Sequence, residues 1–487
     1  MSAIKRALLL STGDRYFALV TNFATVSIVS RILSPGEIGV SVIGAAIVGI
    51  VLSIKEFASS NFLIQRGELS RNDIRSTFTV MLILTLAIAA ALLLAAPWLA
   101  SAYEEPQLAP YLRLVSVALL VELISTQILA LLRRDMVFGK VAITNMAGAA
   151  AGSISTIVLA LLGFSYMSFA WAWLASATAM ALFAIVFRPH FWMFKPSLRH
   201  WREMVAFGGY HGATVVLLRA YEALPYLLLG RMFSPDATGL LSRANMICQL
   251  PDKLIIGGAV PVVLPAFATE VRQGRDLKHP YLKAIELVTA LQWPALVCLA
   301  LLAHPVIHIL LGPQWKDVVP LVQVMAIASL FAFSFELNYP VLVSMGAISD
   351  IFRRALIIFP VSAAMIGAAS FFGLQAVASS FLLVIPFQAF VSMLIVRRRI
   401  AMQWADIAAP LWRSSVVTAT TALGPLAVIM ATGFRLDLPI WQGIFAGCLA
   451  GAGWVMGLKL TRHPLFDELL KTLSLRRFAV QQLREMP

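Results

Sequence analysis

Long apolar segments constrain this chain more than any other feature of its sequence. About fourteen stretches stay apolar over the roughly 20 residues that a helix needs to cross a bilayer core of about 30 Å. Hydrophobic residues make up 60% of the chain and charged residues only 13%, whereas soluble domains carry about 25% charged residues. A soluble protein of this composition would expose large apolar patches. We therefore predict an all-α polytopic membrane protein with about 14 transmembrane helices.

The positive charges alternate between the loops that connect these stretches. With the N-terminus inside, most of the 38 Lys and Arg residues fall in inside connections, and the short outside turns hold few. This asymmetry predicts cytoplasmic N- and C-termini. It also explains the net charge of +14 by the attraction of cytoplasmic loops to anionic membrane lipids. We expect lipid partners and no nucleic-acid partner.

A nine-residue pattern occurs twice in the chain. Residues 31–39 and 231–239 share Arg, Ser, Pro and Gly at equivalent positions. A Pro in the first turn needs no amide hydrogen, and the Ser before it can cap the free amides. Ser34 and Glu37 have the spacing of a capping box. Each copy therefore predicts a tight outside hairpin between the first two spans of its half.

The repeat predicts how the chain is divided. Because each half would hold six spans, both halves enter the membrane in the same sense, and a pseudo-two-fold axis along the membrane normal should relate the two six-helix lobes. We predict an N-terminal lobe over 1–187, a cytoplasmic linker over 188–203, a C-terminal lobe over 204–400, two additional C-terminal helices over 401–460 and a basic cytoplasmic tail over 461–487.

Ionisable residues within spans mark the candidate site, because each costs roughly 2.5–3.5 kcal/mol at a helix centre and usually faces a cavity. Each residue could instead form a structural ion pair or reach the membrane surface. We favour a cavity for Arg15, Arg219 and Arg243, because the equivalent first spans of the two halves both carry a charge pair. Such a cavity would suit a diphosphate, since arginine binds phosphate through two hydrogen bonds. The predicted cavity residues are Asp14, Arg15, Asn22, Arg219, Glu222, Arg243, Asn245 and Gln249, and the predicted gate and hairpin residues are Arg31, Ser34, Pro35, Arg231, Ser234 and Pro235.

Signatures of soluble catalysis do not occur in the sequence. It has no phosphate-binding Gly-Lys-Ser/Thr loop, no Gly-x-Ser-x-Gly and no His-Glu-x-x-His. We predict no catalytic residues, no metal site and no cofactor, and hence a protein that is not an enzyme.

Several short motifs resemble a known family. Residues 31–39, Phe62–Arg66, Leu264–Phe267 and Leu311–Lys316 are similar, in order and spacing, to those of Wzx-like polysaccharide flippases. This family belongs to the multidrug/oligosaccharidyl-lipid/polysaccharide exporter superfamily. The resemblance implies alternating access and an undecaprenyl-diphosphate-linked oligosaccharide, moved from the cytoplasmic to the periplasmic leaflet of a bacterial inner membrane for polysaccharide export. It also suggests a polysaccharide polymerase or co-polymerase as a partner, and we expect a monomer.

Three other functions compete with a flippase. An ion-coupled exporter of drugs or small molecules should line its cavity with acidic residues, and the arginines count against it. A membrane polysaccharide polymerase usually needs a large outside loop, and the outside loops here are short. A scaffold of an assembly complex would not explain paired charges in equivalent spans.

Overall fold

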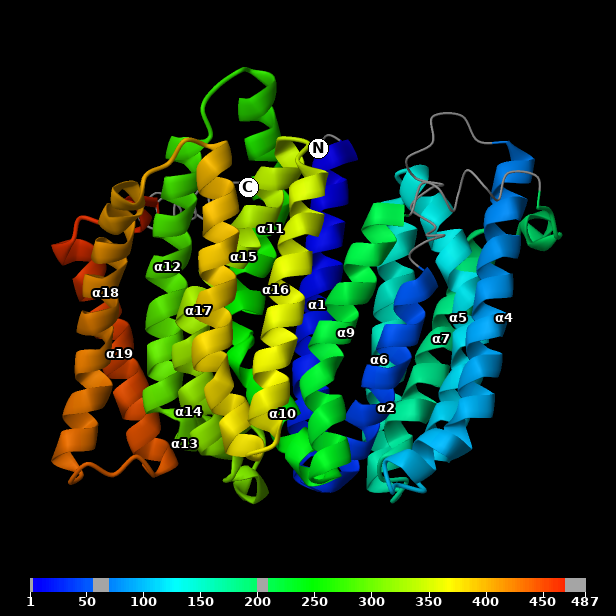
Figure 1. The fold of residues 1–487 in the computed structure, drawn as a ribbon, viewed down its shortest axis with the longest axis horizontal. Helices are drawn as coiled ribbons and strands as arrows, with labels where there is room; N and C mark the ends of the chain where they lie inside the picture. The colour runs from blue at the N-terminus through cyan, green and yellow to red at the C-terminus, as the bar shows by residue number, and fades with distance from the viewer. Residues whose placement is uncertain (1–2, 56–69, 199–208, 469–487) are drawn as a thin grey trace, which may run out of the picture. The chain divides into compact units, whose positions relative to one another are not determined.

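The computed structural model describes residues 3–55, 70–198 and 209–468, which are folded almost entirely as helices (Figure 1). Residues 199–203 of the predicted linker and 469–487 of the predicted tail lie outside this description. The first part of the chain forms α1 (Ala3–Ile32), α2 (Pro35–Ser53), α4 (Arg71–Ala102), α5 (Leu108–Arg134), α6 (Phe138–Leu161), α7 (Met167–Phe187), the 3₁₀ turn η2 (Phe191–Phe194), α9 (Gly209–Met232), α10 (Pro235–Cys248) and α11 (Leu250–Arg272). The remainder forms α12 (Lys278–Leu301), α13 (Ala303–Leu310), η3 (Pro313–Trp315), α14 (Val318–Ala328), η4 (Ser329–Phe331), α15 (Phe333–Ser344), α16 (Ile348–Ser370), α17 (Leu374–Arg399), α18 (Trp404–Ala431) and α19 (Ile440–Leu460).

Twelve helical segments of the described chain are long and apolar enough to cross a membrane. A helix satisfies its own backbone hydrogen bonds, so it is the form that an apolar chain takes in lipid. Large apolar side chains such as Leu94, Val186 and Leu383 stay exposed on these segments, as expected for surfaces that face lipid. The prediction of an all-α polytopic membrane protein is confirmed. The polar helix α1 and the broken pair α10 and α11 are not among the twelve.

The chain folds into two compact units. Unit 1 comprises Met1–Ser242 and Phe359–Leu374, and unit 2 comprises Arg243–Ile358 and Gln375–Pro487. The boundary between the units therefore falls inside α10 and inside α16. The predicted lobes divide the chain elsewhere, and they remain a prediction.

The core of unit 1 is built around α5. Tyr111, Leu112 and Val115 of this helix are buried together with side chains of α2, α4 and α7. Further along α5, the amide of Gln127 donates to the Ile74 carbonyl of α4 at 2.9 Å. Helix α5 ends at Arg133 and Arg134, where the positive charges suit both the helix dipole and a lipid surface.

The core of unit 2 is built around α12, which packs against α11, α14, α15 and α18. The buried Tyr281 hydroxyl donates to Asn338 of α15 at 2.5 Å. Near the middle of α12, Ala290 is buried with Val417 of α18 and Leu458 of α19. Helices α18 and α19 are thus part of the core of unit 2.

Both copies of the repeated pattern form the predicted hairpins. Only two residues separate α1 from α2, and only two separate α9 from α10. The Ser34 side chain accepts from the Glu37 amide, and the Glu37 carboxylate accepts from the Ser34 amide at 2.7 Å. In the second copy the Ser234 hydroxyl accepts from the Ala237 amide at 3.2 Å. The capping predicted from the Ser-Pro spacing is confirmed.

Candidate functional site

Helix α1 carries three of the predicted cavity residues in unit 1. The Asp14 carboxylate accepts a hydrogen bond of 2.7 Å from the Asn145 amide of α6, against which α1 packs. Arg15 and Asn22 are exposed. The bond to Asn145 fixes the rotation of α1 and keeps Asp14 partly buried, while the arginine beside it stays accessible.

Helix α9 carries a second charge pair in unit 1. Arg219 and Glu222 form an ion pair of 2.8 Å, and their side chains are 55% and 47% exposed. Tyr221, between them, stacks on Phe359 with ring centroids 5.1 Å apart. Because both charged side chains are about half exposed, the ion pair lies on a part of α9 that other helices leave uncovered. Two half-exposed charges within an apolar span favour a face in contact with water or with a polar ligand.

Arg243 of α10 has a different environment, in unit 2. Its side chain is only 6% exposed, and its guanidinium lies 5.7 Å from the centroid of the Trp315 ring. Its Nε has no hydrogen-bond partner among the described residues. Further along the chain, the Gln249 amide donates to Asn245 at 3.1 Å. Arg243 is therefore a buried cation stabilised by an aromatic face.

The structure places five of the eight predicted cavity residues in unit 1 and three in unit 2. Within unit 1 it pairs Arg219 with Glu222, and within unit 2 it pairs Asn245 with Gln249. That all eight line one cavity stays a prediction.

The two hairpins cross each other at a pair of glycines in unit 1. A Cβ on Gly39 would overlap the Pro235 carbonyl and lie 3.0 Å from Pro235 Cα. A Cβ on Gly239 would overlap the Pro35 carbonyl and lie 3.2 Å from the Gly39 nitrogen. Each copy of the pattern thus places its glycine against the proline of the other copy. Only glycine allows two helix backbones to approach so closely.

The second hairpin also makes an ion pair with the α4–α5 turn. Arg231 lies 3.0 Å from Glu104, and both side chains are exposed. Burial and the nearby Asp236 carboxylate raise the pKa of Glu105. Burial raises the pKa of Tyr103, against the opposing effect of Arg231. Arg231, one of the predicted gate residues, is thus paired with the α4–α5 turn.

Sequence reasoning missed three residues of these arrangements: Asn145, Trp315 and Glu104. Asn145 could have been found as a polar residue within an apolar span. Trp315 stands in the motif Leu311–Lys316, which pointed to a family but not to a partner for Arg243. Glu104 had no local signal, because its partner is 127 residues away in the chain.

Comparison with solved structures defines the class of protein. Over 95% of this chain and 99% of the other, the fold is similar to that of the lipid II flippase MurJ in an inward closed conformation, with a TM-score of 0.75 and 13% identity. It is also similar to an inward-facing multidrug resistance MATE family transporter of the MOP superfamily, over 81% of this chain and 98% of the other, with a TM-score of 0.65 and 16% identity. The chain thus shares the fold of these membrane proteins.

Residues 28–320 match the family model described as "Polysaccharide biosynthesis protein", and the chain belongs to this family. It is 25% identical over 339 residues to the succinoglycan biosynthesis transport protein ExoT of Rhizobium meliloti (strain 1021), which covers 69% of this chain and 68% of that protein. It is 22% identical over 330 residues to the lipopolysaccharide biosynthesis protein WzxC of Escherichia coli (strain K12), covering 66% of each. The matches thus span about two thirds of these bacterial relatives. The predicted Wzx-like family and a transporter rather than an enzyme are confirmed.

Proposed function

We propose that this protein is a flippase for an undecaprenyl-diphosphate-linked oligosaccharide, which it moves from the cytoplasmic to the periplasmic leaflet of a bacterial inner membrane. The observation that carries the proposal is a set of exposed charged side chains on helices of unit 1: Arg15 on α1 and the Arg219–Glu222 pair on the apolar helix α9. A diphosphate linked to a lipid and a sugar is an anion that must cross an apolar layer. Arginine side chains that bind the diphosphate within the transporter reduce the free-energy cost of moving this anion across the apolar layer.

The names of the relatives support the cargo class. ExoT is named for the transport of succinoglycan and WzxC for lipopolysaccharide biosynthesis, and MurJ is named as a flippase of lipid II. Repeating-unit polysaccharides and lipid II share one chemical requirement, a carrier lipid joined to a sugar. We extend this cargo class to the present chain and expect a polysaccharide polymerase or co-polymerase to receive the product.

We propose that alternating access moves the cargo, with the crossing of α2 and α10 as part of the outer gate. The gate residues Arg31, Ser34 and Pro35 belong to one hairpin, and Arg231, Ser234 and Pro235 to the other. The chain has no nucleotide-binding motif, so an ion gradient, the membrane potential or downhill flow has to drive the cycle.

We further propose that α1 and the α10–α11 pair join the twelve apolar segments as membrane spans, which gives about fourteen. Helix α1 has 30 residues, or about 45 Å at 1.5 Å per residue, enough to cross a bilayer. The reciprocal contact of Gly39 with Pro235 and of Gly239 with Pro35 supports a pseudo-two-fold relation between two six-helix lobes, with α18 and α19 in addition to them. We expect the transporter to act as a monomer with both termini in the cytoplasm.

The experiment deletes the gene in its host and measures lipid-linked oligosaccharide in each leaflet, with complementation by wild type and by variants. Arg15→Ala and Arg219→Ala should leave glycolipid on the cytoplasmic leaflet and slow its translocation by roughly 10- to 100-fold, the effect of losing a charged hydrogen bond. Arg133→Ala is the matched control, since Arg133 is an exposed arginine in the last turn of α5.

Two results would contradict the proposal. One is unchanged glycolipid and polysaccharide in the deletion strain together with greater drug susceptibility, which would indicate the drug exporter instead. The other is an equal loss of translocation in the control variant and in the cavity variants when all are present in the membrane in equal amounts. That result would mean that surface charge, and not the charges within the spans, determines translocation.

A further inference from the structure

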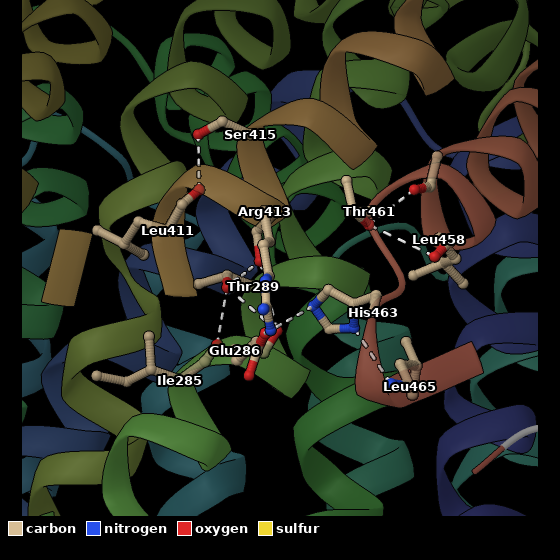
Figure 2. Close-up of polar contacts among 12 residues, drawn as sticks. Ile285, Glu286, Thr289, Leu411, Arg413, Ser415, Leu458, Thr461, His463 and Leu465 are labelled. Atoms are coloured by element: carbon tan, nitrogen blue, oxygen red, sulfur yellow. Dashed lines mark hydrogen bonds and ion pairs between the residues drawn. The ribbon is translucent and has the colours of Figure 1, made fainter. Parts of the chain in front are cut away.

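A fully buried histidine lies where the chain leaves the membrane after α19. His463 has 0% exposure and faces Glu286 of α12 and Arg413 of α18 (Figure 2). Arg413 Nη1 lies 2.9 Å from Glu286 Oε1, and His463 Nε2 lies 3.9 Å from the same oxygen. Neither the cargo nor the gate proposed above uses this cluster, which lies entirely in unit 2.

The hydrogen bonds around His463 define its tautomer. The Leu465 backbone amide donates to Nδ1 at 3.2 Å, so Nδ1 holds a lone pair. The proton of the neutral ring is then on Nε2, which has no hydrogen-bond partner among the described residues and faces the Glu286 carboxylate. In the neutral ring, Nδ1 thus accepts from the Leu465 amide, and the Nε2 proton faces the Glu286 carboxylate.

His463 also acts as a helix cap. Residues 464–468 form a short helical segment that begins at Pro464. Pro is favoured at the first helical position because its missing amide hydrogen is not needed there. A side-chain acceptor before that position satisfies one of the free amides, which is what Nδ1 does for Leu465. The start of this segment therefore depends on an unprotonated Nδ1.

Protonation would reverse these contacts. An imidazolium carries a hydrogen on both nitrogens, so Nδ1–H would meet the Leu465 N–H and the capping bond would be lost. The new positive charge would lie at a helix N-terminus and near Arg413, both of which disfavour it, and only Glu286 would attract it. Burial and Arg413 lower the pKa of His463, and Glu286 opposes them. The docked segment thus favours the neutral ring.

Other contacts in this region do not depend on that proton. The Trp454 indole donates to the Ala290 carbonyl at 2.9 Å, and the Thr289 and Ser414 hydroxyls lie 2.7 Å apart. These uncharged bonds hold α12, α18 and α19 together. Of the remaining charges nearby, Lys283 of α12 lies 3.3 Å from Glu468 of the segment, and Lys459 and Arg462 lie on the chain just before His463. The proton-sensitive contact is confined to the segment that begins at Pro464.

We propose that His463 is a proton-operated latch: neutral, it holds the segment beginning at Pro464 on α12, and protonated, it releases that segment. The latch lies on the side expected to be cytoplasmic, so it responds to acidification of the cell interior. A histidine whose pKa is lowered in the docked state stabilises docking above its ordinary pKa of about 6.5 and loses that effect as the pH falls through the lowered value. The latch does not depend on which cargo the transporter carries.

The experiment measures the distance between α12 and the segment in the full-length protein in lipid nanodiscs. Spin labels are placed on cysteines at the exposed positions His279 and Asp467, with Cys248, Cys298 and Cys448 replaced by alanine. Electron paramagnetic resonance distances are recorded from pH 7.5 to pH 5.0. The wild type should change from one short distance to a broad longer one, with a midpoint below about pH 6.5.

Two variants distinguish a latch from a merely structural histidine. His463→Asn keeps a side-chain acceptor for the Leu465 amide and cannot be protonated, so it should stay docked at every pH. His463→Ala loses the cap and should raise the undocked fraction about fivefold at pH 7.5, the effect of losing an N-cap, with no further change on acidification.

A pH response of the wild type that persists unchanged in His463→Asn would overturn the proposal. So would a wild type that keeps its short distance at pH 5.0. Because the readout is a distance, its failure would leave the flippase proposal untouched, and failure of the flippase proposal would leave the latch untouched.

Discussion

The crossing of α2 and α10 gives the sharpest prediction, because the glycines leave no room for a side chain. In Gly39→Ala the new Cβ would lie 3.0 Å from Pro235 Cα and overlap its carbonyl. Packed carbon atoms lie about 3.5–4.0 Å apart, and the overlap with the Pro235 carbonyl is closer than the contact with its Cα, so the helices would have to separate by more than about 1 Å. Overpacking of this kind costs about 1–3 kcal/mol. We expect Gly39→Ala to lower the unfolding temperature in detergent by several degrees.

A control is available on the same helix. Gly49 of α2 has no heavy atom within 4 Å of its added Cβ, so Gly49→Ala should be neutral or stabilising by up to about 1 kcal/mol. Gly239→Ala should destabilise like Gly39→Ala. The double variant should cost less than the two single costs together, because one separation of the helices relieves both overlaps.

The assay is thermal unfolding followed by tryptophan fluorescence, with translocation measured in parallel. A Gly39→Ala protein as stable as Gly49→Ala would refute the close crossing. Strictly additive costs in the double variant would refute the idea that both overlaps arise at one contact.

Three further predictions concern the charges and caps. Ser34→Ala should lower stability by about 0.5–2 kcal/mol by removing an N-cap, and Ser34→Asp should restore it; thermal unfolding checks both. Arg243→Met should raise stability while abolishing translocation, since it removes a buried charge but keeps the packing against Trp315, and a variant that loses both would contradict a functional role for the charge. Arg231→Ala should change stability by less than about 1 kcal/mol, because its pair with Glu104 is exposed, and unfolding in low and high salt tests this.

Local features of this chain were predictable from the sequence, and long-range partners were not. The capping box at Ser34 and Glu37 depends on residues three positions apart, so spacing alone predicted it. The apolar spans likewise follow from a local run of residues. Asp14 was predicted from its charge within an apolar stretch, but its hydrogen bond to Asn145 depends on how α1 packs against α6.

Burial explains the remaining differences between sequence and structure. Arg243 was selected for its charge, and only the folded structure shows that Trp315 covers it. His463 gave no signal, because a histidine after a span resembles many loop residues. Its role comes from Glu286 and Arg413, which are 177 and 50 positions earlier in the chain.

The reciprocal glycine contact has a consequence for how this chain can vary. It has the form of an isologous interface, in which each partner offers the same surface to the other. Here the two partners are parts of one polypeptide, and the intervening chain keeps them at a high effective concentration. In a homodimer one substitution would alter both halves of such a contact at once. In this fused form each half can change separately, so the two hairpins can differ, as the equivalent residues Glu37 and Ala237 already do, while their glycines still meet.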